Sequence, residues 1–572
     1  MTDALDSVDR DFRAMLGKLT GGIAPQDYGT AFQDWLAKLA ASPEARAELQ
    51  QSALQKATEL WRFHAEALQG RPVAPTETGD RRFADPAWQQ YPFNVFAQTF
   101  RTGMALIGEA ARAVPGVAPR SAELVEFAAR NVAEALSPAN NPLTNPEVLR
   151  QAADEKGQNF ARGYRHFLED LERLLRGGAP PGSAEFPVGG KVATTEGQVI
   201  LRNDLIELIQ YEPTTPDVRA EPVLIVPAWI MKYYILDLSP HNSLVAWLVD
   251  QGHTVFMISW KNPTAADREL GMDDYVRLGV LAALEAVGAI VPGRGVHAVG
   301  YCIGGTLLAI AAALLARRGD RRIRDLSLFA AQTDFSEPGE LSLFISPAQV
   351  EMLEALMRKE GVLDSAKMGA AFTLLRAHDL LWQPAVRSYL KGERDRMIDL
   401  MAWNADGTRM PWRMHTEYLR GLYLQNDLAA GRFQCLGESV SLADMTVPLF
   451  VVGTETDHVA PWKSVYKVGG LANSSEFTFL LTSGGHNAGI VSGPVHPKRR
   501  HRVHTRRAGE PQPGADEWLA ANAPRPGSWW PVWGQWLAAH SSPGRVPAPP
   551  LGAPAAGYGP LGEAPGEYVR QR

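Results

Sequence analysis

Cys302 lies at the centre of the stretch HAVGYCIGGTLLAI, residues 297–310, which has the pattern of a strand, a tight turn and a helix. Glycines at 300 and 304 flank the thiol where such a turn leaves no room for side chains, and Gly305 allows the helix to pack close to the strand. The N-terminus of a helix favours a thiolate, the form of cysteine that attacks carbonyl carbons. The pattern therefore predicts that Cys302 is a nucleophile and not only a small buried side chain.

A nucleophile at such a turn needs a base and an acid, and two later segments supply them in the expected order. Asp457 follows the apolar run VPLFVVGTE, and His486 lies in a glycine-rich loop after FTFLLTSGG. We expect His486 to accept a proton from Cys302 or from an incoming hydroxyl, while Asp457 orients and polarises the imidazole. His458, directly beside Asp457, is the second-choice base.

Backbone groups near the turn are expected to stabilise the oxyanion that forms during attack. The first donor is the N–H of Ile303, the residue after the nucleophile, and the second comes from the loop after VLIVPAW, near Ala228 or Trp229. The other thiol, Cys435, has no glycine turn and no neighbouring base, which indicates a structural role. The sequence has no phosphate-binding glycine loop and no His-Glu-x-x-His pair, so we expect neither a metal nor a cofactor.

The segments around these residues predict a mostly parallel sheet with helices on both faces. Short, nearly continuous apolar runs alternate with helical segments, and QVILRNDLIELIQY has the alternation of a hairpin. The runs are PVLIVPAWI, TVFMISW, VHAVGY, LSLFAAQ, VPLFVVGTE and FTFLLTSGG. Together with the order of nucleophile, acid and histidine, this pattern predicts an α/β-hydrolase fold.

Two domains are expected, with a boundary in the Pro/Gly-rich stretch at 176–190. Residues 1–185 repeat apolar positions at helical spacing and predict a helical N-terminal domain, and residues 186–572 form the catalytic domain. The Pro/Gly-rich tail, residues 541–572, is expected to extend over the surface.

A helical and aromatic stretch at about 335–445 interrupts the alternation of strands and helices. We interpret it as a cap inserted over the carboxyl edge of the sheet. Its tryptophans at 382, 403 and 412 would shield an entrance from water while admitting a long, flexible substrate arm.

Composition narrows the functional classes. The 572 residues carry a net charge of −6, which argues against nucleic acid as the main ligand. Two cysteines exclude a disulfide framework and favour a reducing cytoplasm. The stretch 1–16 has no apolar core of a secretion signal, and no apolar run is long enough to span a bilayer. The basic run at 496–507 is interpreted as a solvated loop, and the tryptophan-rich segment SWWPVWGQW as core.

Segments spread over most of the chain resemble the polyhydroxyalkanoate synthases. The length of the chain and the presence of the N-terminal region resemble class I synthases, which need no second type of subunit. The segments include RRFADPAWQQYPFN, SPANNPLTNPEVL, PAWIMKYYILDLSPHNSLVAWLVDQGHTVFMISWKNP, GYCIGGTLLA, TDFSEPGELSLFI, HDLLWQPAVRSYLKGE, WNADGTRMPWRMHTEYLRGLYLQNDL, GTETDHVAPWKSVY, GGHNAGIV and GSWWPVWGQWL.

The resemblance implies an acyltransferase that polymerises (R)-3-hydroxyacyl groups from coenzyme A thioesters, chiefly 3-hydroxybutyryl-CoA, and releases CoA. Cys302, Asp457 and His486 match the catalytic positions of that family. The resemblance also implies a cytoplasmic homodimer that contacts the growing polyester chain and the granule surface, with phasins as accessory partners. CoA thioester is a substrate in this scheme, and no cofactor is needed.

Three residues depart from the family pattern without touching the triad. Met231 stands where asparagine is common, Val532 where an acid is usual, and Asn487 where an aliphatic residue follows the catalytic histidine.

Two other functions stay open. A Cys-dependent thioesterase or depolymerase would use the same three residues but pass the acyl group to water. A granule-surface scaffold would keep the fold without catalysis.

Overall fold

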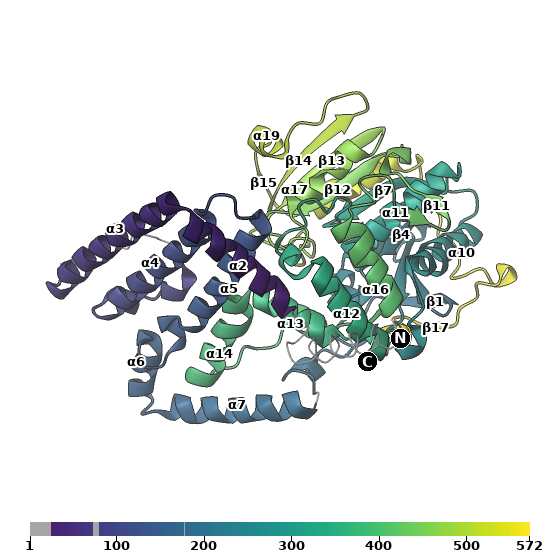
Figure 1. The fold of residues 1–572 in the computed structure, drawn as a ribbon. Helices are drawn as coiled ribbons and strands as arrows, with labels where there is room; N and C mark the ends of the chain where they lie inside the picture. Colours follow the sequence, from purple (N-terminus) through teal and green to yellow (C-terminus); the bar gives the residue numbers. More distant parts are fainter. Residues whose placement is uncertain (1–23, 72–78, 177) are drawn as a thin grey trace, which may run out of the picture. The chain divides into compact units, whose positions relative to one another are not determined.

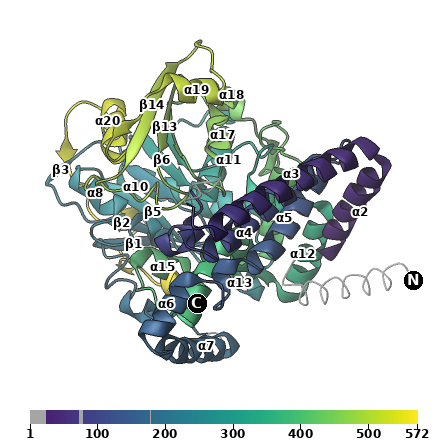
Figure 2. The same cartoon turned by 90° about the vertical axis from the view of Figure 1, so that its left-hand side faces the viewer.

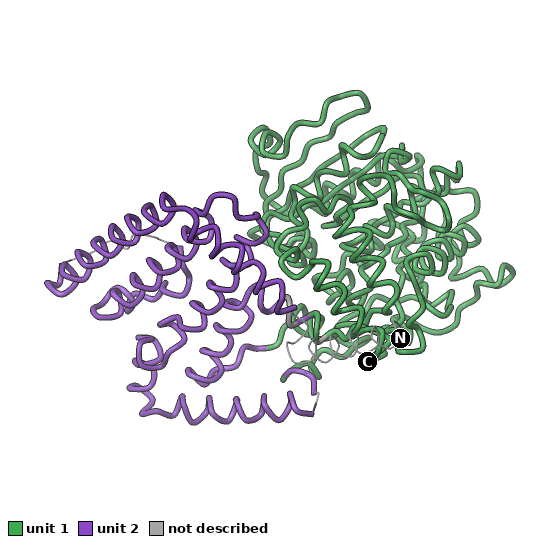
Figure 3. Tube along the Cα trace, viewed as in Figure 1, with its two compact units in different colours: residues 1–15, 181–368, 397–572 green, residues 16–180, 369–396 purple. Residues whose placement is uncertain are grey.

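The computed structural model describes residues 24–71, 79–176 and 178–572. Their contacts form two compact units, coloured in Figure 3. Unit 1 holds residues 181–368 and 397–572, and unit 2 holds the described residues from 24 to 180 together with 369–396. The stretch 1–16, which we examined for a secretion signal, lies outside the described residues.

Unit 1 is built on an eleven-stranded sheet in the described part of the chain. From edge to edge the order is β15 (Arg525–Pro526), β14 (Arg500–Arg507), β13 (Glu476–Thr482), β12 (Leu449–Thr454), β7 (Ile323–Phe329), β6 (Val296–Tyr301), β4 (Val223–Val226), β5 (Val255–Trp260), β2 (Ile206–Tyr211), β1 (Gly197–Arg202) and β17 (Gly562–Glu563). The six strands from β5 to β13 run parallel, and β2 and β14 add to them in antiparallel direction. All six predicted apolar runs are strands, and the predicted hairpin is the β1–β2 pair.

The central strands are buried on both faces. Every residue of β4, β5, β6 and β12 is buried, so successive side chains that point to opposite faces are all covered. Figures 1 and 2 show helices around the sheet. The helices of unit 1 are α8 (Leu244–Asp250), α9 (Met272–Asp274), α10 (Ala282–Ile290), α11 (Ile303–Arg317), α12 (Pro347–Glu360), α15 (Asp399–Asn404), α16 (Trp412–Tyr418), α17 (Trp462–Tyr466), α18 (Val468–Leu471), α19 (Ala515–Ala521) and α20 (Trp530–His540).

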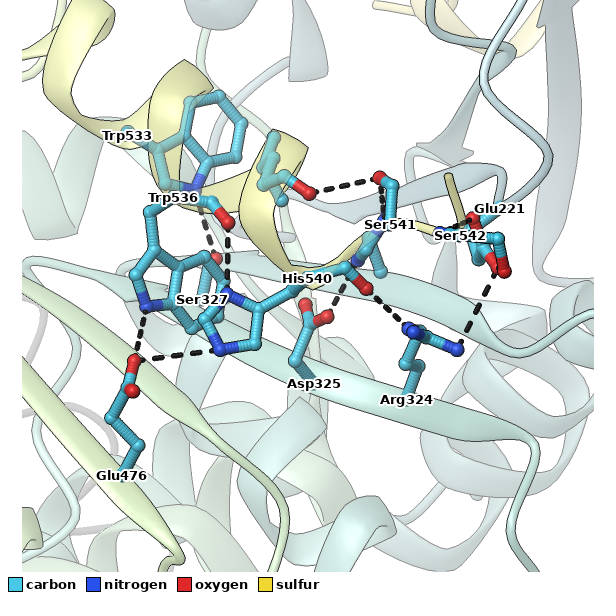
Figure 4. A network of polar contacts seen from close by, with 12 residues as sticks. Glu221, Arg324, Asp325, Ser327, Glu476, Trp533, Trp536, His540, Ser541 and Ser542 are labelled. Atoms are coloured by element: carbon cyan, nitrogen blue, oxygen red, sulfur yellow. Dashed lines mark hydrogen bonds and ion pairs between the residues drawn. The ribbon is translucent and has the colours of Figure 1, made fainter. Parts of the chain in front are cut away.

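Helix α20, which contains most of the tryptophan-rich segment, is fastened to the sheet by its indole groups (Figure 4). The Nε1–H of Trp533 donates to Oγ of Ser327 in β7 at 2.9 Å, and that of Trp536 donates to Oε1 of Glu476 in β13 at 3.0 Å. Trp533 is fully buried. The prediction that these tryptophans belong to the core is confirmed, and their polar edges fix the register of the helix as well.

A buried polar network lies where α20 ends, at the amino ends of β6 and β7. His297 and Asp325 are fully buried, and Nδ1 of His297 lies 2.6 Å from Oδ2 of Asp325. Nε2 of His297 meets Oγ of Ser541 at 3.0 Å. The backbone N–H and the hydroxyl of Ser542 donate to Glu221, at 2.9 and 2.5 Å. These bonds hold the start of the C-terminal tail against the sheet.

Further along, the tail adds short strands to unit 1. β16 (Val546–Pro547) pairs with β3 (Asp217–Val218), and β17 pairs with β1. The Nζ of Lys232 donates to the backbone oxygen of Gln571 at 2.7 Å.

Unit 2 is helical. Its helices are α2 (Pro25–Ala41), α3 (Pro43–Leu68), α4 (Phe93–Arg112), α5 (Pro119–Ala135), α6 (Pro146–Asp154), α7 (Gln158–Arg176) and the short α14 (Gln383–Ala385), while α13 (Ser365–Leu375) runs across the boundary between the units. Proline at the first helical position and a side-chain cap start several of them. Ser42 accepts from the N–H of Ala45 at the start of α3, and Asn145 accepts from the N–H of Glu147 at the start of α6.

The predicted insert divides between the units. Residues 369–396 belong to unit 2, where Nδ2 of Asn159 donates to the backbone oxygen of Leu390 at 2.8 Å. The hydroxyl of Tyr389 donates to Asp170 of α7 at 3.0 Å. The insert therefore does not form one contiguous cap, because its middle part packs with the N-terminal helices. The predicted boundary after residue 185 lies close to the junction of the units at 180 and 181.

The interpretation of the basic run as a loop was wrong. Residues Arg500–Arg507 form β14, which pairs with β13 from His501 to Arg507. The guanidinium groups of Arg502 and Arg506 donate to the backbone oxygens of Asn522 and Gly469. These two charged groups are therefore hydrogen-bonded within the protein, while the backbone of β14 extends the sheet. Charged side chains are common on strands near a sheet edge, and charge alone could not distinguish this strand from a loop.

Substitution of Asp325 tests how much the buried His297–Asp325 pair, at the amino ends of β6 and β7, contributes to stability. Asp325→Ala leaves a buried imidazole without its carboxylate, so we expect the free energy of unfolding to fall by about 3 kcal/mol. Asp320→Ala is the matched control, because Asp320 pairs with Arg322 at the surface and its loss costs about 1 kcal/mol or less. Urea unfolding followed by tryptophan fluorescence measures both variants. Equal losses would contradict the role of the buried pair.

Candidate active site

Cys302 sits in a strained turn between β6 and α11. Its backbone has φ 55° and ψ −131°, a conformation that costs a non-glycine residue on the order of 1–3 kcal/mol. Its N–H donates to the backbone oxygen of Phe329 in β7, and its backbone oxygen accepts from the N–H of Gly305, both at 2.9 Å. The turn is thus held by the neighbouring strand and by the helix that it starts.

The three glycines around Cys302 are required by close backbone approaches. A Cβ on residue 304 would lie 2.5 Å from the carbonyl carbon of Pro227, at the end of β4. A Cβ on residue 305 would lie 2.5 Å from Cβ of Ala331, and one on residue 300 would collide with the backbone of Gly305. The sequence argument for these glycines is confirmed by the packing.

Asp457 is held in place by four hydrogen bonds after the end of β12. Its Oδ1 accepts from the N–H groups of Val459 and Ala460, at 2.9 and 2.8 Å. Its Oδ2 accepts from Oγ1 of Thr454 at 2.9 Å and lies 2.7 Å from Nδ1 of His486. Burial raises the pKa of Asp457, but the charge of His486 and these hydrogen bonds outweigh it and lower the pKa below its ordinary value. The carboxylate is therefore ionised near neutral pH.

His486 joins the carboxylate to the thiol. It follows β13 and lies within hydrogen-bond reach of both Asp457 and Cys302. Burial alone lowers the pKa of His486, but the negative charges of Asp457 and Cys302 and the hydrogen bonds to both raise it well above its ordinary value. The structure thus brings together the three residues that the sequence singled out, in an arrangement that favours the protonated imidazole of His486.

Aromatic side chains of the insert lie near the sulfur. The charge of Cys302 contributes, after burial, to a raised pKa of both Tyr418 and Tyr423, which places the two phenols in its electrostatic range. The rings of Tyr418 and Tyr423 are 5.5 Å apart, and Phe335 lies 4.7 Å from Tyr423. Trp229, after β4, lies 6.2 Å from Tyr418. This part of the insert therefore covers the carboxyl ends of the strands.

The tryptophans that we expected at an entrance have other roles. Trp403 is buried, and its Nε1–H donates to the backbone oxygen of Lys232 at 2.7 Å. Trp412 packs under the guanidinium of Arg358 at 4.8 Å. Trp382 belongs to unit 2. No sequence signal distinguished Tyr418 and Tyr423, because tyrosines at helical spacing are common in any core.

The loop that carries His486 has no regular secondary structure, and side chains of the tryptophan-rich segment SWWPVWGQW, residues 528–536, hold its backbone. Nε1 of Trp529 donates to the backbone oxygen of residue 489 at 3.1 Å, and Nε1 of Trp530 donates to that of residue 490 at 2.9 Å. Oγ of Ser528 donates to the backbone oxygen of residue 492 at 2.5 Å.

Arg499 adds to this support, because Nη1 and Nη2 donate to the backbone oxygens of Ser483 and Ala488, at 3.2 and 2.5 Å. Burial lowers the pKa of Arg499. Sequence reasoning missed these contacts, because backbone acceptors leave no signal in the sequence.

The predicted oxyanion donors stay predictions, and the structure shows where they lie. Ile303 is the first residue of α11, where backbone N–H groups have no partner within the helix. Ala228 and Trp229 follow β4 directly and are buried. Thr408 of the insert fixes this loop, because its Oγ1 donates to the backbone oxygen of Trp229 at 2.5 Å.

The remaining candidates are placed as follows. The imidazole of His486 contacts the carboxylate of Asp457. His458, the second-choice base, is the next residue along the chain after Asp457. Cys435 is buried in β10 (Gln434–Cys435), and burial raises the pKa of its thiol to about 12. Among the described residues no group of three or more His, Cys, Asp or Glu side chains is arranged to hold a metal ion. No helix within the described ranges is both long and apolar enough to cross a membrane.

Family models match most of the chain. The model described as the N-terminus of poly-beta-hydroxybutyrate polymerase (PhaC) matches residues 79–248, and a further N-terminal model of that polymerase matches residues 3–44. The model of the alpha/beta hydrolase fold matches residues 221–492 and confirms the predicted fold class. Among solved structures, a monoglyceride lipase from Saccharomyces cerevisiae is 13% identical with a TM-score of 0.37, covering 62% of this chain and 99% of the lipase chain.

Curated relatives match at nearly full length. A poly(3-hydroxyalkanoate) polymerase of Methylorubrum extorquens is 40% identical over 93% of this chain and 87% of its own length. The chain belongs to the poly(3-hydroxyalkanoate) polymerase family. The polymerase subunit PhaC of Cupriavidus necator is 35% identical over 94% of this chain and 90% of its own length. The resemblance stated from the sequence is therefore confirmed at the level of the poly(3-hydroxyalkanoate) polymerases.

The coupling of Asp457 to His486 in this polymerase predicts a pH-dependent loss of thiol reactivity. Asp457→Asn removes the charge that raises the pKa of His486 more than that of Cys302 does, so that pKa falls and less imidazolium faces the sulfur near neutral pH. We expect alkylation of Cys302 by iodoacetamide at pH 7 to slow by about tenfold or more, since one pKa unit is a factor of ten. Peptide mass spectrometry of the alkylated protein measures the rate.

Asp267→Asn is the matched control for this variant. Asp267 also has a lowered pKa, because its bonds to Lys261 and Thr264 outweigh burial, but it does not contact the triad. An Asp457→Asn protein that reacts as fast as Asp267→Asn would contradict the coupling.

Proposed function

We propose that this chain polymerises (R)-3-hydroxyacyl groups, chiefly from 3-hydroxybutyryl-CoA, with release of CoA through an acyl thioester on Cys302. The observation that carries the proposal is the placement of His486 between Asp457, which it contacts at 2.7 Å, and Cys302, whose charge acts on it, in a member of the polymerase family. The proposal includes the class I form, in which one type of subunit suffices.

In the first half of the proposed cycle, Cys302 takes the acyl group. His486 holds the proton of the thiol, and the sulfur attacks the carbonyl carbon of the CoA thioester. The oxyanion is stabilised by the N–H of Ile303 and by a second N–H near Ala228. The bond between carbon and the CoA sulfur breaks, and CoA leaves with the proton that His486 returns.

In the second half, a hydroxyl of another monomer or of the growing chain takes the acyl group. His486 accepts the hydroxyl proton, the oxygen attacks the carbonyl carbon on Cys302, and the thiolate leaves. A cysteine thioester has about the activation of the incoming CoA thioester, so loading costs little free energy. The transfer to oxygen then runs downhill, because an oxygen ester is less activated. A serine nucleophile would lose that driving force at the first step.

Water is the competitor for the acyl group, and its exclusion distinguishes a polymerase from a thioesterase or depolymerase. Tyr418, Tyr423 and Phe335 supply an aromatic cover near the sulfur. This cover favours transfer of the acyl group to an alcohol over hydrolysis, because aromatic side chains offer water few hydrogen bonds and so help to exclude it from the site. The alternative, a Cys-dependent thioesterase or depolymerase, uses the same residues and is decided by the product.

The proposal extends to the setting of the enzyme. We expect a homodimer in the cytoplasm that contacts the growing polyester and the granule surface, with phasins as accessory partners. The cycle needs no cofactor beyond the CoA substrate. These elements are supported by the sequence resemblance, and each needs its own experiment.

Substitution of Cys302 tests the chemistry. With purified protein and 3-hydroxybutyryl-CoA, we expect Cys302→Ala to abolish CoA release and Cys302→Ser to lower it by several orders of magnitude. Free thiol is followed with a thiol reagent, and turbidity is recorded alongside. Insoluble polyester identifies a polymerase, and soluble 3-hydroxy acid identifies a hydrolase.

Cys435→Ser is the control for this experiment, since that thiol is buried in β10 and burial raises its pKa to about 12. It should release CoA at the rate of the unaltered protein. Polymerisation by Cys302→Ser at a comparable rate would refute the thioester argument.

A further inference from the structure

One hydrogen bond joins the residue before the nucleophile to the residue after the histidine. Tyr301 is the last residue of β6, and its hydroxyl donates to Oδ1 of Asn487 at 2.6 Å. The ring of Tyr301 also lies 5.7 Å from the imidazole of His486. The bond therefore spans the two chain segments that carry the reacting groups.

The direction of this bond is fixed by its surroundings. Tyr301 is 1% exposed, and a buried hydroxyl needs a partner. Burial, together with the charges of Cys302 and Asp457, raises the pKa of Tyr301 well above its ordinary value, so the phenol keeps its proton. Asn487 offers a carbonyl oxygen that accepts whatever the charge of Cys302. The bond is thus retained through changes in the charge of the sulfur.

The position of the bond complements the other supports of the loop. Trp529 and Trp530 of the tryptophan-rich segment, and Arg499 directly before β14, hold the backbone at residues 483–490. The Tyr301–Asn487 bond ties the same loop to the strand that ends at Cys302. The loop has no ladder of its own, so the distance between sulfur and imidazole depends on such ties.

We propose that Tyr301 and Asn487 form a positioning pair that holds the imidazole of His486 against the sulfur of Cys302. The inference rests on the proposed roles of Cys302 and His486. It gives a function to Asn487, the residue at which this chain departs from the family pattern directly after the histidine.

Loss of a purely structural hydrogen bond lowers only the stability of the protein, whereas loss of a positioning hydrogen bond also lowers the reactivity of the Cys302 thiol. Tyr301→Phe removes the hydroxyl and leaves Asn487, which is half-buried, open to water. Asn487→Leu leaves a buried hydroxyl without its acceptor, so it costs more stability than Tyr301→Phe. If the pair positions His486, the two variants lose thiol reactivity to a similar extent although their stabilities differ.

The experiment measures the alkylation of Cys302 by iodoacetamide between pH 5 and pH 9 in the full chain without substrate. Cys435 serves as the internal reference, because burial raises the pKa of its thiol to about 12. Tyr466→Phe is the matched control, since Tyr466 is also buried and its hydroxyl donates to the backbone oxygen of Pro513 at 3.1 Å. Thermal unfolding of each variant is recorded alongside.

We expect Tyr301→Phe and Asn487→Leu each to slow alkylation near pH 7 by about three- to tenfold, the range that one neutral hydrogen bond supplies. The double variant should be no slower than the slower single variant, because both act through one bond. Tyr466→Phe should keep the rate and pH profile of the unaltered protein. Asn487→Ala replaces Asn487→Leu if the leucine variant does not fold.

Two results would overturn the positioning pair. One is a pH profile of Tyr301→Phe that matches Tyr466→Phe, and the other is a double variant whose loss equals the product of the single losses. Failure of the proposed function looks different, because it is read from CoA release by Cys302→Ala and not from alkylation. A reactive Cys302 in a protein that transfers no acyl group would leave the pair intact and remove the polymerase proposal.

Discussion

The strained backbone of Cys302 is the constraint on which the site depends. A side chain at φ 55° persists only where its surroundings impose that conformation. Here β7 accepts its N–H, and the glycines at 304 and 305 let α11 approach β4 and the segment after β7. The position of the sulfur is thus set by the sheet. Because β6, β7, β12 and β13 are consecutive in the sheet, the acid and the histidine that follow β12 and β13 reach the same edge.

Much of this arrangement could be predicted from the sequence because its signals are local. Strands of a parallel sheet are buried on both faces and form short continuous apolar runs, which identified β4 to β7, β12 and β13. The glycines around Cys302 indicate a tight turn between a strand and a helix, and few other local structures require glycine at these positions. Asp457 and His486 each lie just after such a run, and the polarity of parallel strands then brings them together.

The rest depends on contacts between distant segments, which a single sequence does not reveal. The insert has helical spacing throughout, and nothing in that spacing indicated that residues 369–396 would pack with the N-terminal helices. The tryptophans of SWWPVWGQW were rightly assigned to the core, but the N–H groups of Trp529 and Trp530 donate to backbone oxygens of the His486 loop. The Tyr301–Asn487 bond joins residues 186 positions apart.

The charges of the triad give the proposed cycle a direction. Burial lowers the pKa of His486, and two negative charges, those of Asp457 and Cys302, together with their hydrogen bonds raise it again. Acylation converts the sulfur to a neutral thioester and removes one of these charges. The pKa of His486 then falls, which favours the neutral imidazole, the form that can accept a proton from the incoming hydroxyl in the proposed cycle. When the thiolate leaves, its charge returns and favours the imidazolium again. In the proposed cycle the same group thus faces the sulfur as imidazolium and serves as base for the alcohol.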